Sequence, residues 1–572
     1  MSELEASKLR YGRGCAAAVV TLLVSLQNAH FDDDESLIRF HDALLFLRAF
    51  PQSRNVVELT ENLLSRIPQQ VGRLRDSDAG MTLFESEQFS GIAGTVISDS
   101  FTYEVTRWLV RCYPKQLSVD WNFDEQGTQM GVSLPRFLPL LADDSLVEAD
   151  TPFLQWMERA AGSADRILPW LLQRLEDAPA SMLEKTAWYD ALQISVSWNL
   201  GNSPASRTCA RRNPPSLYFH REPLIRRRQV SLAEEFGSPP LPVHKLARHE
   251  GEDVLDMVRA ALTVRYRELY GTTRGDPESV VEADLGRGVH IFVWGLPPDR
   301  RLPLRAYYAG ITLKNGVPIN YIEGISLFEW MEVGFNTFYA FRDGETAWIY
   351  SKVLHLLYQL TDVTCFSVYP YQLGDQNEEA IRSGAFWFYR KLGFRPGRPE
   401  LLAMTRREEA KIASQADHRT SARTLRKLAA DRVFYEFGDR PRGIWDTFSV
   451  RIIGLSVQQR MAEEFNGDRE KMRCSVSAAL SKDLHVNTRT WSAFEQSAFE
   501  DFAFVLSLVP DLRSWTGIQK RRLIEIIRAK VSADESDYLR LLQLHTTLKE
   551  ALLRLGSTNP ASDRQSYRAA AM

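Results

Sequence analysis

Residues 383–394 read Ser-Gly-Ala-Phe-Trp-Phe-Tyr-Arg-Lys-Leu-Gly-Phe, and this stretch decides the predicted fold. Four consecutive aromatic residues, 386–389, are too many for a solvated helix, so we expect a helix buried against a sheet. Arg390 and Lys391 fall in its last turn, where cations complement the helix dipole. Gly393 then supplies the left-handed residue that ends the helix before a new strand begins.

The residues around this helix alternate between helical and strand patterns from about 248 to 405. Asn315-Gly316 lies between two apolar runs and predicts a β-hairpin, because both residues tolerate a positive φ. The predicted helices are 253–270, 346–360 and 376–392, and the predicted strands are 289–294, 305–313, 317–325, 332–341, 365–370 and one that starts at 394. This region is therefore predicted to be a mixed α/β domain.

Tyr389-Arg390-Lys391-Leu392-Gly393-Phe394, together with this order of elements, resembles the GNAT acyltransferases over residues 248–405. The resemblance implies transfer of an acyl group from acetyl-CoA or another acyl-CoA to an amine of a small molecule or a protein. It further implies that Tyr389 protonates the departing thiolate. Glu332, on a predicted strand with Glu323 and Glu329 before it, is the candidate general base, and a surface charge is the alternative.

The resemblance also implies a pyrophosphate-binding turn at Arg342-Asp343-Gly344-Glu345-Thr346-Ala347, because exposed N–H groups at a helix start favour an anion. We expect Arg342, Gly344, Thr346 and Ala347 to contact the cofactor. Arg382 stands where many members have an asparagine and could pair with a phosphate. The turn departs from the family pattern, since it has one glycine and a carboxylate at Glu345. An ordinary strand-to-helix turn is the alternative.

The fold class predicted for the whole chain is α+β, a GNAT-like mixed sheet with helices, flanked by N- and C-terminal all-α domains. Apolar residues recur at helical spacing before and after the mixed region, with prolines breaking the pattern. The expected divisions are a helical domain at 1–200, a Pro/Arg-rich connection at 201–247, the acyltransferase-like domain at 248–405, a helical domain at 406–555 and a disordered tail at 556–572. The C-terminal helices could pack within the chain or against a second copy.

Within the connection, the stretch 207–228 carries seven arginines and the single acid Glu222, interleaved with aromatic residues. Such a pattern suits contact with single-stranded RNA or tRNA, and a structural strap across acidic faces of the neighbouring domains is the alternative. The arginines are Arg207, Arg211, Arg212, Arg221, Arg226, Arg227 and Arg228.

Composition excludes several other classes of protein. The formal net charge of -3 predicts no bulk attraction to nucleic acid or to an anionic membrane. Five cysteines lie far apart, which indicates neither a disulfide framework nor a zinc site and favours the cytoplasm. The apolar run 15–26 is interpreted as a helix rather than an export signal, and no membrane span is expected. Asp32–Glu35 is interpreted as a helix cap rather than a metal site.

Two further functions remain open at this stage. The protein could have the same fold but use aminoacyl-tRNA as the donor, as some relatives of this fold do. This donor would account for the unusual turn beside an arginine-rich segment. A third hypothesis is a non-catalytic scaffold, in which a degenerate acyltransferase domain joins two helical modules. The turn at 342–347 is the feature on which these alternatives differ.

Overall fold

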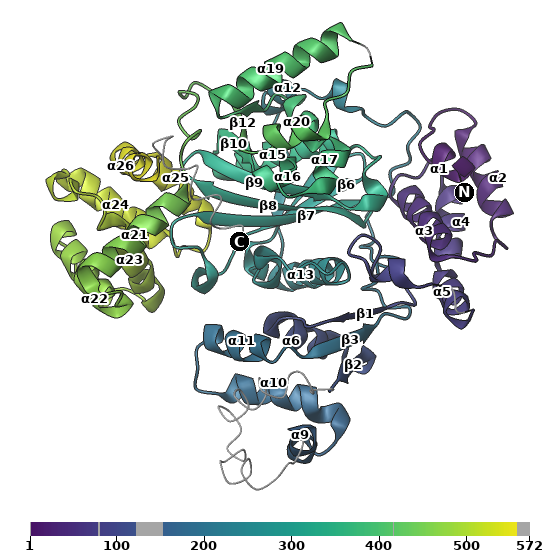
Figure 1. Cartoon of the computed structure of the whole chain (residues 1–572), viewed down its shortest axis with the longest axis horizontal. Coiled ribbons are helices and arrows are strands. Elements are labelled where there is room, and N and C mark those ends of the chain that lie inside the picture. The colour runs from purple at the N-terminus through teal and green to yellow at the C-terminus, as the bar shows by residue number, and fades with distance from the viewer. Residues whose placement is uncertain (1, 78–79, 122–152, 416, 558–572) are drawn as a thin grey trace.

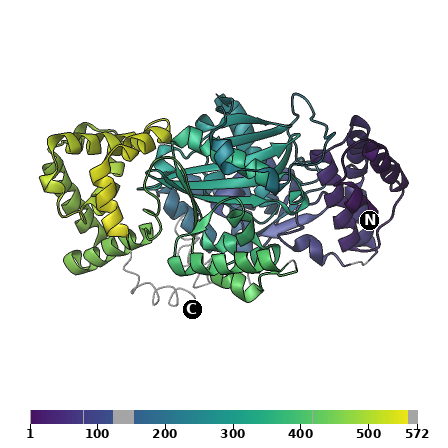
Figure 2. The ribbon, with the colours of Figure 1, turned by 90° about the horizontal axis from the view of Figure 1, so that it is seen from above.

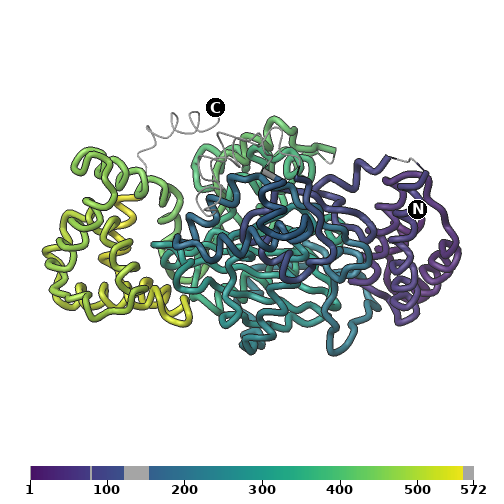
Figure 3. Tube along the Cα trace, turned by 90° about the horizontal axis from the view of Figure 1, so that it is seen from below, coloured from purple at the N-terminus to yellow at the C-terminus, as the bar shows by residue number. Residues whose placement is uncertain are grey.

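The computed structural model describes residues 2–77, 80–121, 153–415 and 417–557. Most of the predicted tail, residues 558–572, lies outside these ranges. Figure 1 shows a central sheet with N-terminal helices at one end, C-terminal helices at the other, and a smaller α/β unit below the sheet. Figures 2 and 3 show the same row of bodies from above and from below.

The central sheet has nine strands in the order β11-β12-β10-β9-β8-β7-β6-β5-β4. Strands β9 and β10 are parallel, and the other neighbouring pairs are antiparallel. The strands are β4 (Val243–Lys245), β5 (Val281–Gly286), β6 (Val289–Trp294), β7 (Ala306–Lys314), β8 (Val317–Leu327), β9 (Trp330–Thr337), β10 (Cys365–Val368), β11 (Arg395–Pro396) and β12 (Val433–Glu436).

The predicted hairpin is confirmed. Strands β7 and β8 pair up to Lys314 and Val317, and Asn315 and Gly316 take φ values of 49° and 80° in the turn. The sheet extends beyond the predicted limits of 248–405, because β4 lies in the connection and β12 returns between β10 and β11. Strand β12 has only four residues, which is too short for a periodic pattern to reveal it.

Helices cover both faces of the sheet, as Figure 1 shows. One face carries α12 (Leu232–Phe236), α15 (Thr346–Thr361), α16 (Pro370–Leu373), α17 (Glu378–Ser383), α18 (Ala385–Arg390), α19 (Pro399–Ser414) and α20 (Ala422–Leu428). The other face carries α13 (Arg248–Thr263). The short helix α14 (Tyr270–Thr273) contacts α13 and β7.

The predicted helix 376–392 is interrupted. Gly384 adopts a left-handed φ of 67° and separates α17 from α18. Phe386 and Tyr389 are buried as expected, while Trp387 and Phe388 are half-buried. Gly393 has a φ of 107°, so it ends the segment as predicted.

The N-terminal region is not all-α, contrary to expectation. Its helices α1 (Ser2–Ser7), α2 (Cys15–Ser25), α3 (Asp34–Ala49), α4 (Arg54–Leu64) and α5 (Ile67–Asp76) share the main hydrophobic core. A separate core contains a three-stranded sheet in the order β1-β3-β2. That unit consists of β1 (Val96–Asp99), β2 (Leu117–Asp120), β3 (Ser195–Asn199), α6 (Tyr103–Cys112), α9 (Phe153–Ala161), α10 (Ile167–Asp177) and α11 (Met182–Ala191). Its strands are only four or five residues long, which explains why helical periodicity dominated the pattern.

The C-terminal body is helical from residue 450 onward. Residues 517–556, at the end of the predicted helical domain, form three helices, because the chain turns before Glu535 and Thr546. The helices are α21 (Val450–Phe465), α22 (Arg469–Leu484), α23 (Ala493–Leu506), α24 (Gly517–Ala529), α25 (Glu535–Gln543) and α26 (Thr546–Gly556). Within the described ranges, no helix combines the length and apolar character needed to cross a bilayer.

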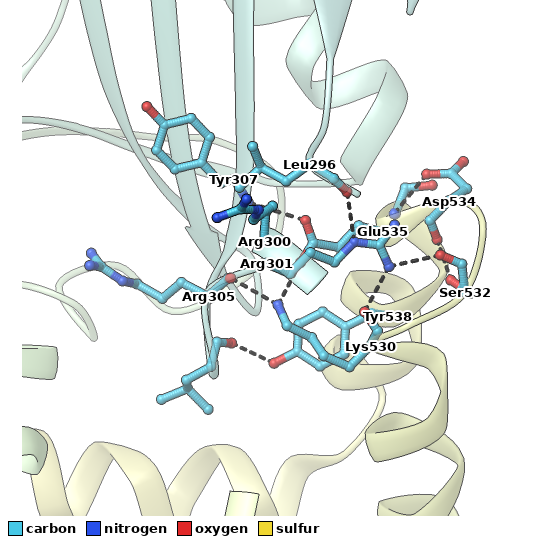
Figure 4. Close-up of polar contacts among 12 residues, drawn as sticks. Leu296, Arg300, Arg301, Arg305, Tyr307, Lys530, Ser532, Asp534, Glu535 and Tyr538 are labelled. Atoms are coloured by element: carbon cyan, nitrogen blue, oxygen red, sulfur yellow. Dashed lines mark hydrogen bonds and ion pairs between the residues drawn. The ribbon is translucent and has the colours of Figure 1, made fainter. Parts of the chain in front are cut away.

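A buried ion pair joins this body to the sheet, as Figure 4 shows. Lys530 and Glu535 are each 3% exposed, and Lys530 Nζ lies 2.5 Å from Glu535 Oε1. Lys530 also donates to the carbonyl of Arg305, and Glu535 accepts from the backbone N–H of Tyr307. The turn between α24 and α25 is thereby fixed to the start of β7.

Candidate functional site

The gap where β9 and β10 separate is the candidate functional site. The two parallel strands pair only as far as Glu332 and Ser367. Beyond this point Gln372, on α16, spans the gap and accepts from the backbone N–H of Phe335 at 3.4 Å. A Cβ atom on Gly334 would lie 2.9 Å from Gln372 Nε2. The side-chain amide of Gln372 therefore packs directly against β9 at Gly334, where a larger residue would displace it.

Tyr389 reaches the same gap from the α15 side of the sheet. Its hydroxyl donates to Gln372 Oε1 at 3.3 Å, and its ring packs against Tyr350 and Phe394. Burial raises the pKa of Tyr389, so the phenol stays protonated at neutral pH. The predicted acid is therefore a buried phenol that can still donate a proton.

Glu332 lies on the opposite face of the sheet, together with Glu323. Glu323 pairs with Gly334, and Ile325 pairs with Glu332, so the two carboxylates project on one face as diagonal neighbours. Their Cα atoms are about 7–8 Å apart in such an arrangement. Tyr307, on β7, pairs with Ile325 of β8 and donates its hydroxyl to Glu323.

Both carboxylates are half-buried, and both have raised pKa values. Burial is the main cause in each case. The hydroxyl of Tyr307 opposes the shift at Glu323, and the charges of Arg432 and Arg305 oppose it at Glu332. A carboxylate whose pKa moves toward neutrality is better suited to accept a proton from an amine. By contrast, Glu329 is buried in ion pairs with Lys549 and Arg440, which gives it a structural role.

The turn before α15 does not fit a pyrophosphate. A Cβ atom on Gly344 would lie 2.6 Å from Phe50 Cζ, so the end of α3 packs directly against the turn. The side chain of Glu345 is fully buried and accepts from the backbone N–H of Ile225 at 3.0 Å and from Arg287 Nε at 3.2 Å. A fixed carboxylate already lies where the resemblance implies a phosphate.

The other predicted cofactor residues are not gathered around a shared space. Arg342 pairs with Glu379 and stacks on Tyr339. Thr346 donates to the carbonyl of Arg342 at 3.4 Å, and Ala347 is buried. Arg382 is exposed near the end of α17, and its charge contributes, after that of Arg426, to lowering the pKa of Glu378.

The arginine-rich connection is largely occupied by contacts within the protein. Arg207 is buried and donates to the carbonyl of Gln88, Arg211 pairs with Glu61, and Arg227 donates to the carbonyl of Lys391. Arg212 lies over the ring of Phe292. Arg221, Arg226 and Arg228 are exposed. These contacts favour a structural role for four of the seven arginines, and of these four contacts the one made by Arg211 is to an acidic side chain, as a strap across acidic faces requires.

Sequence reasoning missed Gln372, Arg287 and the role of Tyr307. Arg287 lies in the turn between β5 and β6 at a φ of 55°, and no spacing rule links it to Glu345, which lies far along the chain. Gln372 follows a predicted strand at its carboxyl end, where ligand-binding residues of open sheets are found, and that position was a usable signal.

Asp33 caps α3 by accepting from Ser36 N, as predicted for the acidic run. The part of the chain that the structure describes contains no cluster of three metal-ligating side chains.

Comparisons with models of known protein families, with curated proteins and with solved structures found no match to this chain.

Proposed function

We propose that this protein transfers an acyl group to an amine, as the resemblance of residues 248–405 to GNAT acyltransferases implies. The observation that supports the proposal best is the gap between β9 and β10, which has carboxylates on one face and a protonated phenol on the other. The order of elements from α13 through β11 also supports the proposal, apart from the additional strand β5 before β6 and the division of the helix before β11 into α17 and α18.

In this proposal Glu332 or Glu323 removes a proton from the acceptor amine. The amine nitrogen then forms a bond to the acyl carbon, and the bond from that carbon to the leaving group breaks. The leaving group takes a proton from the hydroxyl of Tyr389, while the proton of the amine stays on Glu332 or Glu323. Gln372 must move aside for a ligand to enter, and a ligand carbonyl could then accept from the N–H of Phe335.

The donor is the open part of the proposal. Acyl-CoA is the donor that the resemblance implies, and its pyrophosphate would have to bind away from the turn that Glu345 and Phe50 fill. Aminoacyl-tRNA is the alternative donor of the same fold. Three exposed arginines, Arg221, Arg226 and Arg228, are available for such an RNA.

The test is an acyl-transfer assay that offers a panel of amines, first with acyl-CoA and then with aminoacyl-tRNA. Replacing a general base reduces the rate by about 10²–10⁴-fold, so Glu332→Gln or Glu323→Gln should lower kcat by that factor. Glu222→Gln, at an exposed glutamate of the connection, is the matched control and should leave the rate unchanged. Equal rates in all three variants would overturn the assignment of the base.

The buried turn before α15 favours a second function, a non-catalytic scaffold. In that case the domain keeps its fold, while Glu345 and Phe50 occupy the space at the start of α15 where a phosphate would bind. Isothermal titration with acetyl-CoA and with desulfo-CoA tests this on the wild type and on Phe50→Ala, which removes the side chain that covers Gly344. Absence of binding in both proteins, together with absence of product from either donor, would support the scaffold.

A further inference from the structure

A small cavity at the end of β9 is lined by three arginines from two separate parts of the chain. Arg207 comes from the connection, and Arg265 and Arg267 follow α13. The lining also includes Asn336 and Phe338 from the β9 side and one carboxylate, Glu87, which pairs with Arg267 at 3.6 Å. The cavity volume is about 10 Å³, which is room for about one water-sized group.

Two of these guanidinium groups are buried without an acidic partner. Arg207 is 6% exposed and Arg265 is 7% exposed. Among the described residues, no carboxylate oxygen lies within 4.0 Å of either guanidinium. Arg207 Nη1 donates to the carbonyl of Gln88 at 2.9 Å, while its buried Nε has no hydrogen-bond partner within the described part of the chain. Arg265 donates to the carbonyl of Ala261 and lies 3.9 Å from the ring centroid of Phe338.

The surrounding charges do not balance this pair. Asp42 is near enough to favour both cations, but its carboxylate bonds His41 Nδ1 at 3.1 Å. Arg267 has its own partners in the hydroxyl of Tyr321 and in Glu87. Burial lowers the pKa of both Arg207 and Arg265, and the charge of Arg207 lowers that of Arg265 further. Arginine nevertheless stays protonated in proteins, so the cost of burying two adjacent cations remains.

We propose that this cavity binds a small inorganic anion between Arg207 and Arg265. The planar guanidinium groups present several donors at fixed angles, which suits a halide or one oxygen of a phosphate. Asn336 follows Gly334 by two residues in β9, so the anion would lie about 7 Å along the strand from the gap. Two buried cations that have no acidic partner among the described residues carry this proposal, which is independent of the proposed acyl transfer.

Thermal unfolding of the full chain tests this site in sodium chloride, sodium phosphate and sodium gluconate at one ionic strength. Gluconate is too large for the cavity and serves as the baseline. Chloride or phosphate should raise Tm by about 2–4 °C in a saturable way. The rise should disappear in Arg265→Met and persist in Arg221→Met, a control at an exposed arginine of the same connection. Equal Tm values in the three salts, or an unchanged rise in Arg265→Met, would overturn the proposal.

Anomalous diffraction from bromide tests the site in the wild-type protein, and so does not require Arg265→Met to fold. Crystals of the wild-type protein grown in sodium bromide should show an anomalous bromide peak between Arg207 and Arg265. Its replacement by phosphate density in phosphate buffer would identify an oxyanion site, and its persistence in that buffer would identify a halide site. A cavity without a peak in either buffer would contradict the inference.

Discussion

Glu345 and Arg287 form a bidentate ion pair at the start of α15, and the side chain of Glu345 is fully buried there. The pair connects the turn between β5 and β6 to the helix, while Ile225 donates from the connection. Lys314, which is also buried, adds a second positive charge beside the pair. Three separate segments of the chain therefore meet at the turn that the sequence marks as a phosphate site.

Glu345→Gln should destabilise the protein by about 3 kcal/mol, because it leaves Arg287 and Lys314 next to each other without an acid. Urea unfolding followed by tryptophan fluorescence measures the change. Glu252→Gln is the matched control, since Glu252 pairs with Arg248 at an exposed site, and it should cost less than about 0.5 kcal/mol. A similar small loss in both variants would show that the pair at α15 contributes little.

Lys314 should make stability increase with pH above neutrality. Burial lowers its pKa from 10.5 to about 7, with Glu345 opposing the shift and Arg287 adding to it. Between pH 7 and pH 10.5 the unfolded chain therefore binds a proton that the folded protein has released, so raising the pH favours the folded state. The gain across this window is on the order of 4 kcal/mol.

The measurement compares urea unfolding of the wild type and Lys314→Met from pH 6 to pH 10. The wild type should gain stability relative to the variant only above about pH 7, since Lys314 is protonated in both states at lower pH. Curves that remain parallel over the whole range would show that Lys314 does not titrate in the folded protein.

The sequence predicts local elements well where a pattern spans a whole helix or hairpin. Helix α15 begins at the predicted Thr346, and the turn at Asn315-Gly316 is the predicted one. These features depend on residues that are close in the chain. Strand β12 and the unit containing β1–β3 were missed, because short strands gain their stability from partners far away in sequence.

The site was predicted less completely for the same reason. Tyr389 and Glu332, which the resemblance singles out, lie on either side of the gap. Motif spacing alone does not reveal that Phe50, from the N-terminal helices, covers Gly344. Nor does it reveal Gln372, whose side chain links β9 to α18 through Phe335 and Tyr389.

Gln372→Ala should loosen the gap between β9 and β10. The substitution leaves the N–H of Phe335 and the hydroxyl of Tyr389 without their acceptor, which costs about 1–3 kcal/mol. Gln372→Glu keeps an acceptor oxygen and should cost less. A double-mutant cycle with Tyr389→Phe measures the coupling between the two side chains, and a coupling energy near zero would contradict the bond between them.

The buried ion pair between Lys530 and Glu535 attaches the C-terminal helices to β7, and removing one partner should cost more stability than removing both. Lys530→Met leaves the carboxylate of Glu535 buried and unpaired, which costs about 3–5 kcal/mol. Hydrogen exchange should then speed up in α24 and α25 before it changes in β8 or β9, because the helices lose their attachment to β7.

Adding Glu535→Gln to Lys530→Met should recover much of that loss. The second substitution removes the unpaired charge and keeps an oxygen that accepts from the N–H of Tyr307. Lys482→Met, at the exposed end of α22, is the control for a lysine removed from the same body. If the double variant were no more stable than Lys530→Met, the attachment would depend on the hydrogen bond from Lys530 to the carbonyl of Arg305 rather than on charge balance. In that case the hydrogen bond from Lys530 to the carbonyl of Arg305 would hold the start of β7 in place. Tyr307, which follows on β7 and donates to Glu323, would then depend on this bond for its position.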